Sequence, residues 1–62
     1  MNTSETNIII DHAKAFASVG GMDTDSTIAL ALHETLADAI ESASDYESAL
    51  AIANSIVNNF DY

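Results

Sequence analysis

The chain has 62 residues and carries ten Asp and Glu against one Lys and no Arg, so its formal net charge is −9. It contains no Cys, which excludes a disulfide scaffold, a thiol-ligated metal site and a cysteine nucleophile. A single cation cannot neutralise a run of phosphates, so we expect no direct binding to nucleic acid.

This length permits one small domain over residues 1–62. Proline is absent and alanine is abundant, which favours helix along the whole chain. We therefore predict an all-α fold with helices over about residues 4–19, 25–43 and 45–60. Three helices joined by short turns form a small three-helix bundle or a helical hairpin arrangement, which we expect homodimerisation to complete.

The first predicted helix, residues 4–19, has one apolar face when successive residues are placed 100° apart. That face comprises Ile8, Ile9, Ala13, Ala15, Phe16 and Val19. His12 lies in its middle, where a buried neutral imidazole is expected and a ligand or general base is the alternative. Ile10 falls off this face, and the β-branched isoleucine run leaves a short strand as an alternative. Gly20-Gly21 predicts the helix end.

The second predicted helix, residues 25–43, follows a segment rich in N-cap residues. Its apolar stripe comprises Ile28, Ala29, Leu32, Leu36, Ala39, Ile40 and Ala43. The third predicted helix, residues 45–60, begins with a capping box between Ser44 and Glu47. Its stripe comprises Tyr46, Ala49, Leu50, Ala53, Ile56, Val57 and Phe60.

A row of carboxylates follows one face of the second helix. Glu34, Asp38 and Glu41 are spaced i, i+4 and i+7, which places them on the same side. A solvated acidic face is the plain interpretation of this row, and a docking surface for a basic partner is the functional one. We take these three residues as the candidate partner-binding site.

The apolar residues least well explained by a monomer are Ile10, Leu30 and Ala37, each of which lies off its stripe. Together with His33 they form a candidate oligomer or partner contact. A chain of this size buries only about 60% of its unfolded surface and commonly needs a supplement. We therefore expect a homo-oligomer, with a two-fold dimer as its simplest form.

Asp25-Ser26 resembles the signature of acyl-carrier proteins, in which an Asp-Ser-Leu sequence presents the serine for phosphopantetheine attachment. The resemblance implies modification of Ser26 and docking of the acidic second helix on basic enzymes. Thr27-Ile28 stand where that family has leucine directly after the serine, and the alternative is that Ser26 caps the helix. The acidic spacing over residues 23–34 also resembles a calcium-binding loop, but Ile28 occupies the glycine position of that loop.

The remaining polar residues form no catalytic set, and we predict no enzyme, no cofactor and no metal site. We predict a non-catalytic acidic protein-protein interaction module that binds a basic surface of a partner, as a small phage-type inhibitor of a nucleic-acid-binding protein does. The alternatives are a homo-oligomeric scaffold or regulator, a small-molecule sponge, and a carrier modified on Ser26. No signal segment or membrane span is recognisable, so a cytoplasmic protein without membrane contact is expected.

Overall fold

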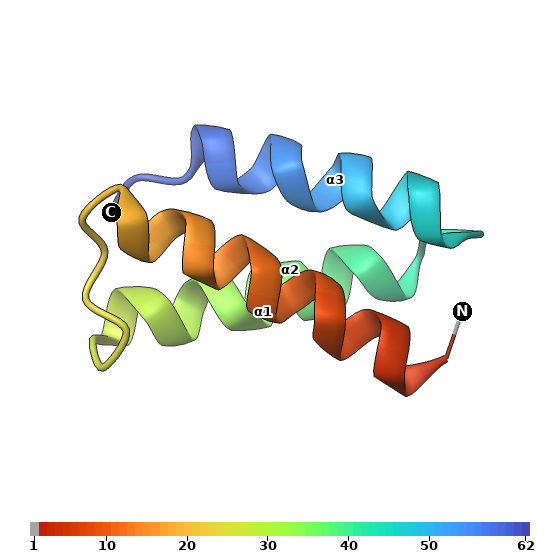
Figure 1. Ribbon diagram of the computed structural model, residues 1–62, viewed down its shortest axis with the longest axis horizontal. Helices are drawn as coiled ribbons and strands as arrows, with labels where there is room; N and C mark the ends of the chain where they lie inside the picture. The colour runs from red at the N-terminus through yellow and green to blue at the C-terminus, as the bar shows by residue number, and fades with distance from the viewer. Residues whose placement is uncertain (1) are drawn as a thin grey trace.

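The computed structural model describes residues 2–62, which form three α-helices and no strand. The helices are α1 (Thr3–Val19), α2 (Thr27–Glu41) and α3 (Tyr46–Asn59). Consecutive helices run in opposite directions, and each helix packs against the other two (Figure 1). The predicted all-α fold is confirmed, and the isoleucine run belongs to α1 rather than to a strand.

Helix α1 begins with a reciprocal cap that the sequence prediction missed. The Asn2 Oδ1 atom accepts from the Glu5 N–H at 2.9 Å, and the Asn2 N–H donates to Glu5 Oε1 at 3.3 Å. The helix ends at Val19, as predicted, and Gly20 is its C-cap. Gly21 has φ +110°, a conformation that side chains with a Cβ rarely adopt, so the glycine pair explains the sharp turn.

Helix α2 begins at Thr27, two residues later than predicted, because Ser26 is its N-cap. The Ser26 Oγ atom accepts from the Ala29 N–H at 3.2 Å and donates to the Asp23 carbonyl at 2.6 Å. The helix ends at Glu41, two residues before the predicted boundary.

Helix α3 is capped by Asp45, so the predicted capping box between Ser44 and Glu47 is wrong. The Ser48 N–H donates to Asp45 Oδ1 at 2.8 Å, which satisfies one of the free amide groups at the helix start. This backbone hydrogen bond, followed by one from the Ser48 side chain, holds the pKa of Asp45 below its ordinary value of 3.8.

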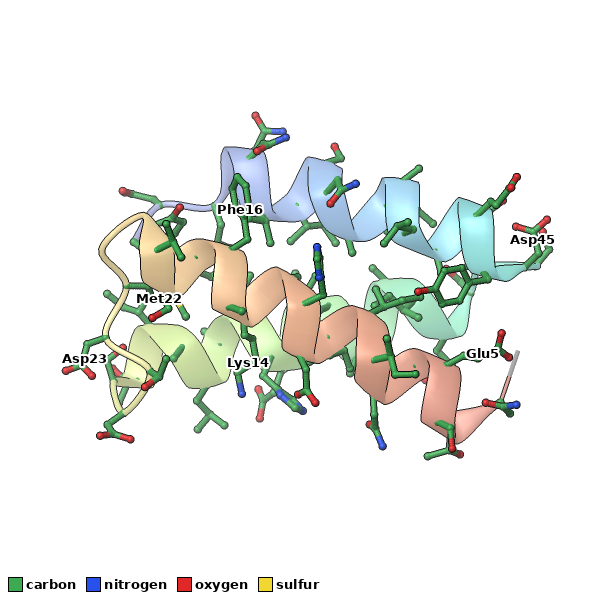
Figure 2. All side chains as sticks on the ribbon, viewed as in Figure 1. Glu5, Lys14, Phe16, Met22, Asp23 and Asp45 are labelled. Carbon is green, nitrogen blue, oxygen red and sulfur yellow. The ribbon has the colours of Figure 1, made fainter. Side chains whose placement is uncertain are left out.

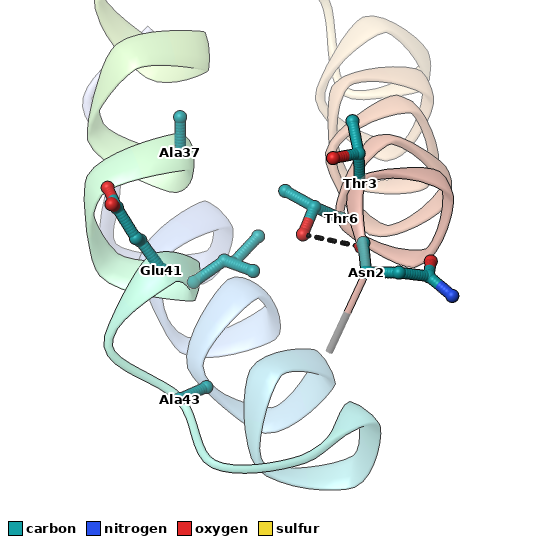
Figure 3. A pocket seen from close by; sticks show the side chains of 7 residues that line it. Asn2, Thr3, Thr6, Ala37, Glu41 and Ala43 are labelled. Carbon is teal, nitrogen blue, oxygen red and sulfur yellow. Dashed lines mark hydrogen bonds between the residues drawn. The ribbon is translucent and has the colours of Figure 1, made fainter.

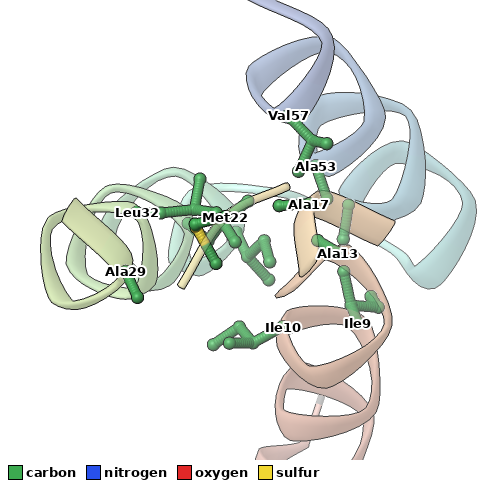
Figure 4. Packing of buried hydrophobic residues seen from close by; sticks show 12 residues of the cluster. Ile9, Ile10, Ala13, Ala17, Met22, Ala29, Leu32, Ala53 and Val57 are labelled. Carbon is green, nitrogen blue, oxygen red and sulfur yellow. The ribbon is translucent and has the colours of Figure 1, made fainter. Parts of the chain in front are cut away.

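The core contains twelve buried apolar side chains, drawn from all three helices and the first loop (Figure 4). They are Ile9, Ile10, Ala13, Ala17, Met22, Ala29, Leu32, Leu36, Ile40, Ala49, Ala53 and Val57. The predicted stripes of α2 and α3 supply most of them. Two predicted stripe members, Ile28 and Tyr46, are instead exposed.

The predicted core face of α1 is confirmed for Ile9 and Ala13, which are buried, and wrong for its other four members, which are exposed. Ile10, expected outside the core, is 3% exposed, whereas Ile8 and Phe16 are 57% exposed and Val19 is 91% exposed. His12 is exposed as well, so it is not the buried imidazole that the sequence predicts. The buried face of α1 is rotated by about 120° from the exposed apolar one, at 100° per residue.

The choice of buried face follows from the size of its side chains. Ala13 and Ala17 lie at the centre of the face of α1 that meets the other helices. Helices that cross at short distance need small residues at the contact. A face centred on Phe16 would hold α1 further away and leave gaps around the other side chains.

A matched pair of substitutions tests which isoleucine is in the core. Ile10→Val removes a buried methyl group and is expected to lower the free energy of unfolding by about 0.5–1.5 kcal/mol. Ile8→Val removes the same group from an exposed site and is expected to change it by less than about 0.5 kcal/mol. Urea unfolding followed by far-UV circular dichroism measures both. A larger loss for Ile8→Val would contradict the assigned core.

The Asp45 cap makes a pH-dependent contribution to stability. Its pKa is lower in the folded chain than the ordinary 3.8, so the stabilisation is complete above that value and is lost as the pH falls through the lowered pKa. Asp45→Ala is therefore expected to destabilise the chain at pH 7, with a smaller difference from the parent at pH 3. Urea unfolding at both pH values measures this difference. Asp61→Ala, which removes a carboxylate that caps no helix, is the control. A difference of equal size at both pH values would contradict it.

Candidate functional site: the outer face of α2

The outer face of α2 carries the acidic ridge, which we define as Glu34, Asp38 and Glu41. All three side chains are exposed, and their spacing places them along one side of the helix. Leu30 precedes Glu34 by one turn and is also exposed, and Ala37 lies between the carboxylates. Two groups that the sequence predicts separately, the acidic row and the apolar contact, thus share one face of α2.

The only basic side chain of the chain lies at the edge of this face. The Lys14 Nζ atom of α1 is 3.3 Å from His33 Nδ1 of α2. An ammonium group only donates, so this contact is a hydrogen bond when Nδ1 of His33 carries no proton. The contact is partly buried, and one ammonium group leaves the charge of the acidic ridge largely uncompensated.

A hollow of about 310 Å³ lies between the start of α1 and the end of α2. Figure 3 shows Thr3 and Thr6 of α1 facing Ala37 and Glu41 of α2 across it. The Thr6 hydroxyl donates to the Asn2 carbonyl at 3.2 Å, so it is already engaged. The acidic ridge ends at the rim of this hollow.

A second hollow, of about 470 Å³, lies at the opposite end of the same two helices. Leu30, His33 and Lys14 form one part of its lining, and Asp25 and Ser26 belong to the other. The wall therefore mixes one cation, one carboxylate and apolar surface. The two hollows flank the outer face of α2, one near each end.

The structure brings together three of the four predicted contact residues. Leu30, His33 and Ala37 lie on or beside the face of the acidic ridge, where Leu30 is 60% exposed and the other two are half-buried. Ile10 is part of the core, so the expectation that its side chain is free for a partner is wrong. Sequence reasoning missed Lys14, although its being the only Lys or Arg was a sufficient signal.

The predicted carrier serine has its hydroxyl fully engaged. Ser26 Oγ is donor to the Asp23 carbonyl and acceptor for the Ala29 amide. A phosphopantetheine ester would remove the donated hydrogen and place a bulky group at a half-buried cap. The geometry therefore supports the capping interpretation of Ser26.

Among residues 2–62, no three His, Asp or Glu side chains lie close enough together to hold a metal ion. Within the same residues, no buried polar side-chain atom lacks a hydrogen-bond partner. None of the three described helices combines the length and apolar character that crossing a bilayer requires. Comparison of the chain with protein families, curated proteins and solved structures gave no significant match.

Substitution of Ser26 distinguishes a cap from a modification site. Ser26→Ala is expected to lower the free energy of unfolding by about 0.5–2 kcal/mol. Ser26→Asp is expected to keep most of the stability of the parent, because aspartate is an equally good N-cap. Urea unfolding measures both variants. A Ser26→Ala chain as stable as the parent would contradict the capping role, as would mass added to Ser26 on coexpression with a phosphopantetheinyl transferase.

Proposed function

We propose that this chain is a non-catalytic acidic module that binds a basic surface of a partner protein through the outer face of α2. The observation that carries the proposal is the acidic ridge, in which Glu34, Asp38 and Glu41 are exposed along one helix side. Complementary charge of this kind accelerates encounter and selects basic partners. The exposed Leu30 adds an apolar contact beside the charges.

The dimensions of the ridge favour a nucleic-acid-binding surface as the partner. Residues 34 and 41 are seven positions apart, so the three carboxylates span about 10 Å along a rigid helix. One strand of duplex DNA presents a phosphate about every 3.4 Å along the axis. Lysines and arginines that bind a few phosphates can therefore also bind the ridge. A small phage-type inhibitor that occupies such a cleft in the cytoplasm is the form of this function that we propose.

Neutralising the ridge tests the proposal against a control of equal charge. The variant Glu34→Gln/Asp38→Asn/Glu41→Gln and the control Asp11→Asn/Glu47→Gln/Asp61→Asn each remove three negative charges from exposed positions. Tagged chains are used to capture proteins from nuclease-treated lysate of the native host. The ridge variant is expected to lose at least about 90% of the captured basic protein, and the control less than about half, because ion pairs act over short range.

The captured protein is then eluted in a salt gradient and, separately, with duplex DNA. Elution by moderate salt and by DNA is expected, since both compete for the same basic side chains. If the ridge variant and the control lose the same amount of captured protein, binding depends on net charge alone, which would contradict a defined site. Capture that survives high salt would contradict an electrostatic interface.

A further inference from the structure

Helix α1 carries a second apolar face that the fold leaves exposed. This α1 outer face comprises Ile8, His12, Phe16 and Val19, spaced by four, four and three residues. Phe16 and Ile8 are each more than half exposed, and Val19 almost fully. Figure 2 shows the Phe16 side chain projecting from α1 on the side next to α3. A stripe of this length, about 18 Å along the helix, exceeds a scatter of single apolar residues.

The C-terminal half of this face lacks negative charge. Residues 12–22 contain no Asp or Glu, and neither do residues 48–60. Helices α1 and α3 run in the same direction side by side (Figure 1). Tyr62 follows α3 and lies so close to Gly20 that a Cβ there would be 2.7 Å from Tyr62 Oη. The two acid-free segments thus share one side of the bundle, with the nearest carboxylates in sequence, Asp11, Glu47 and Asp61, just beyond their ends.

The same charge pattern identifies the face through which two copies can meet. Each copy carries a net charge of −9, so most mutual contacts oppose carboxylates. A self-contact through Leu30 would bring Glu34 of both copies into the contact, because Glu34 lies one turn from Leu30 on the same side of α2. Like charges held in contact are strongly unfavourable. The α1 outer face is apolar and its C-terminal half is free of acids, so a second copy meets the least repulsion there.

We propose that the α1 outer face packs against the same face of a second copy about a two-fold axis, with the two α1 helices antiparallel. Antiparallel pairing places Glu5 and Asp11 of each copy opposite residues 16–22 of the other, where no acid occurs. Parallel pairing would instead oppose Glu5 to Glu5 and Asp11 to Asp11. Antiparallel helix dipoles also attract each other weakly.

The proposed dimer is a weak one. A stable specific interface buries about 800 Å² per partner, whereas the whole chain exposes 3935 Å². One helix face about 18 Å long supplies only part of that area, so we expect a dissociation constant on the order of 10 μM to 1 mM. This inference does not rest on the proposed function, because the α2 ridge stays outside the contact.

Sedimentation velocity over a concentration series from about 5 μM to 2 mM tests the contact. The parent is expected to shift from monomer to dimer and no further, because a two-fold contact is closed. Phe16→Asp is expected to raise the dimer dissociation constant more than about tenfold, by placing charges at the centre of the face. Leu30→Asp, the matched control on α2, is expected to change it less than about threefold.

Val19→Glu is a second variant, at a site too exposed to affect the folded monomer. If circular dichroism shows that Phe16→Asp does not fold, the dissociation constant of the Val19→Glu dimer decides the test. Raising NaCl from about 50 to 500 mM is expected to tighten the dimer, since salt screens the repulsion between the copies. A parent that stays monomeric at 2 mM, or a dimer split by Leu30→Asp but not by Val19→Glu, would overturn the proposal.

A mixed sample tests the antiparallel orientation. Unlabelled Ile8→Cys chains carrying a nitroxide are mixed with ¹⁵N-labelled parent chains. Broadening of the amide signals of Val19 and Gly20 in the labelled chains is expected. Broadening centred on Ile8 would show parallel pairing, and broadening confined to α2 would overturn the contact itself.

Discussion

The structure depends on the packing of bulky side chains from α2 against small ones from α1 and α3. Leu32, Leu36 and Ile40 of α2 are fully buried, and with Ile9 they are the largest side chains with that property. The facing helices contribute mainly alanines, such as Ala13 and Ala53. Small residues let the helices approach closely, and the leucines and isoleucines fill the space between them (Figure 4).

The way in which the helices fill the core determines which side chains α1 and α2 leave exposed. Because Leu32, Leu36 and Ile40 anchor one side of α2 in the core, its outward side carries the acidic ridge beside the exposed Leu30. Helix α1 buries Ala13 and Ala17 beside Ile9 and Ile10, and its largest apolar side chain, Phe16, remains outside. One helix therefore presents charge and the other presents apolar surface. These two surfaces are direct consequences of how the core is filled.

The sequence predicts the three helices well because their ends carry strong local signals, such as the glycine pair after Val19 and the cap residues before α2 and α3. It predicts the buried side of α2 because that helix has one apolar stripe. It fails for most of the core face of α1, where apolar residues cover a wide arc and two opposed choices fit the same periodicity. The choice of Ala17 over Phe16 depends on how closely the neighbouring helices approach, which no local pattern contains. The cap of α3 is misplaced by one residue because Ser44 and Asp45 are both good caps.

The charge distribution predicts opposite responses to salt for the two proposed contacts. The proposed binding at the acidic ridge would weaken as salt rises, whereas the proposed contact between copies would strengthen because their mutual repulsion is screened. A dimer formed through α1 would carry two ridges on one particle, each on an α2 helix outside the contact. If a partner has two basic sites, the second binding step becomes intramolecular, and avidity can exceed single-site affinity by about a hundredfold or more without any new contact. Even a weak association between copies would then raise the affinity for such a partner, because a two-site partner holds the copies together by mass action.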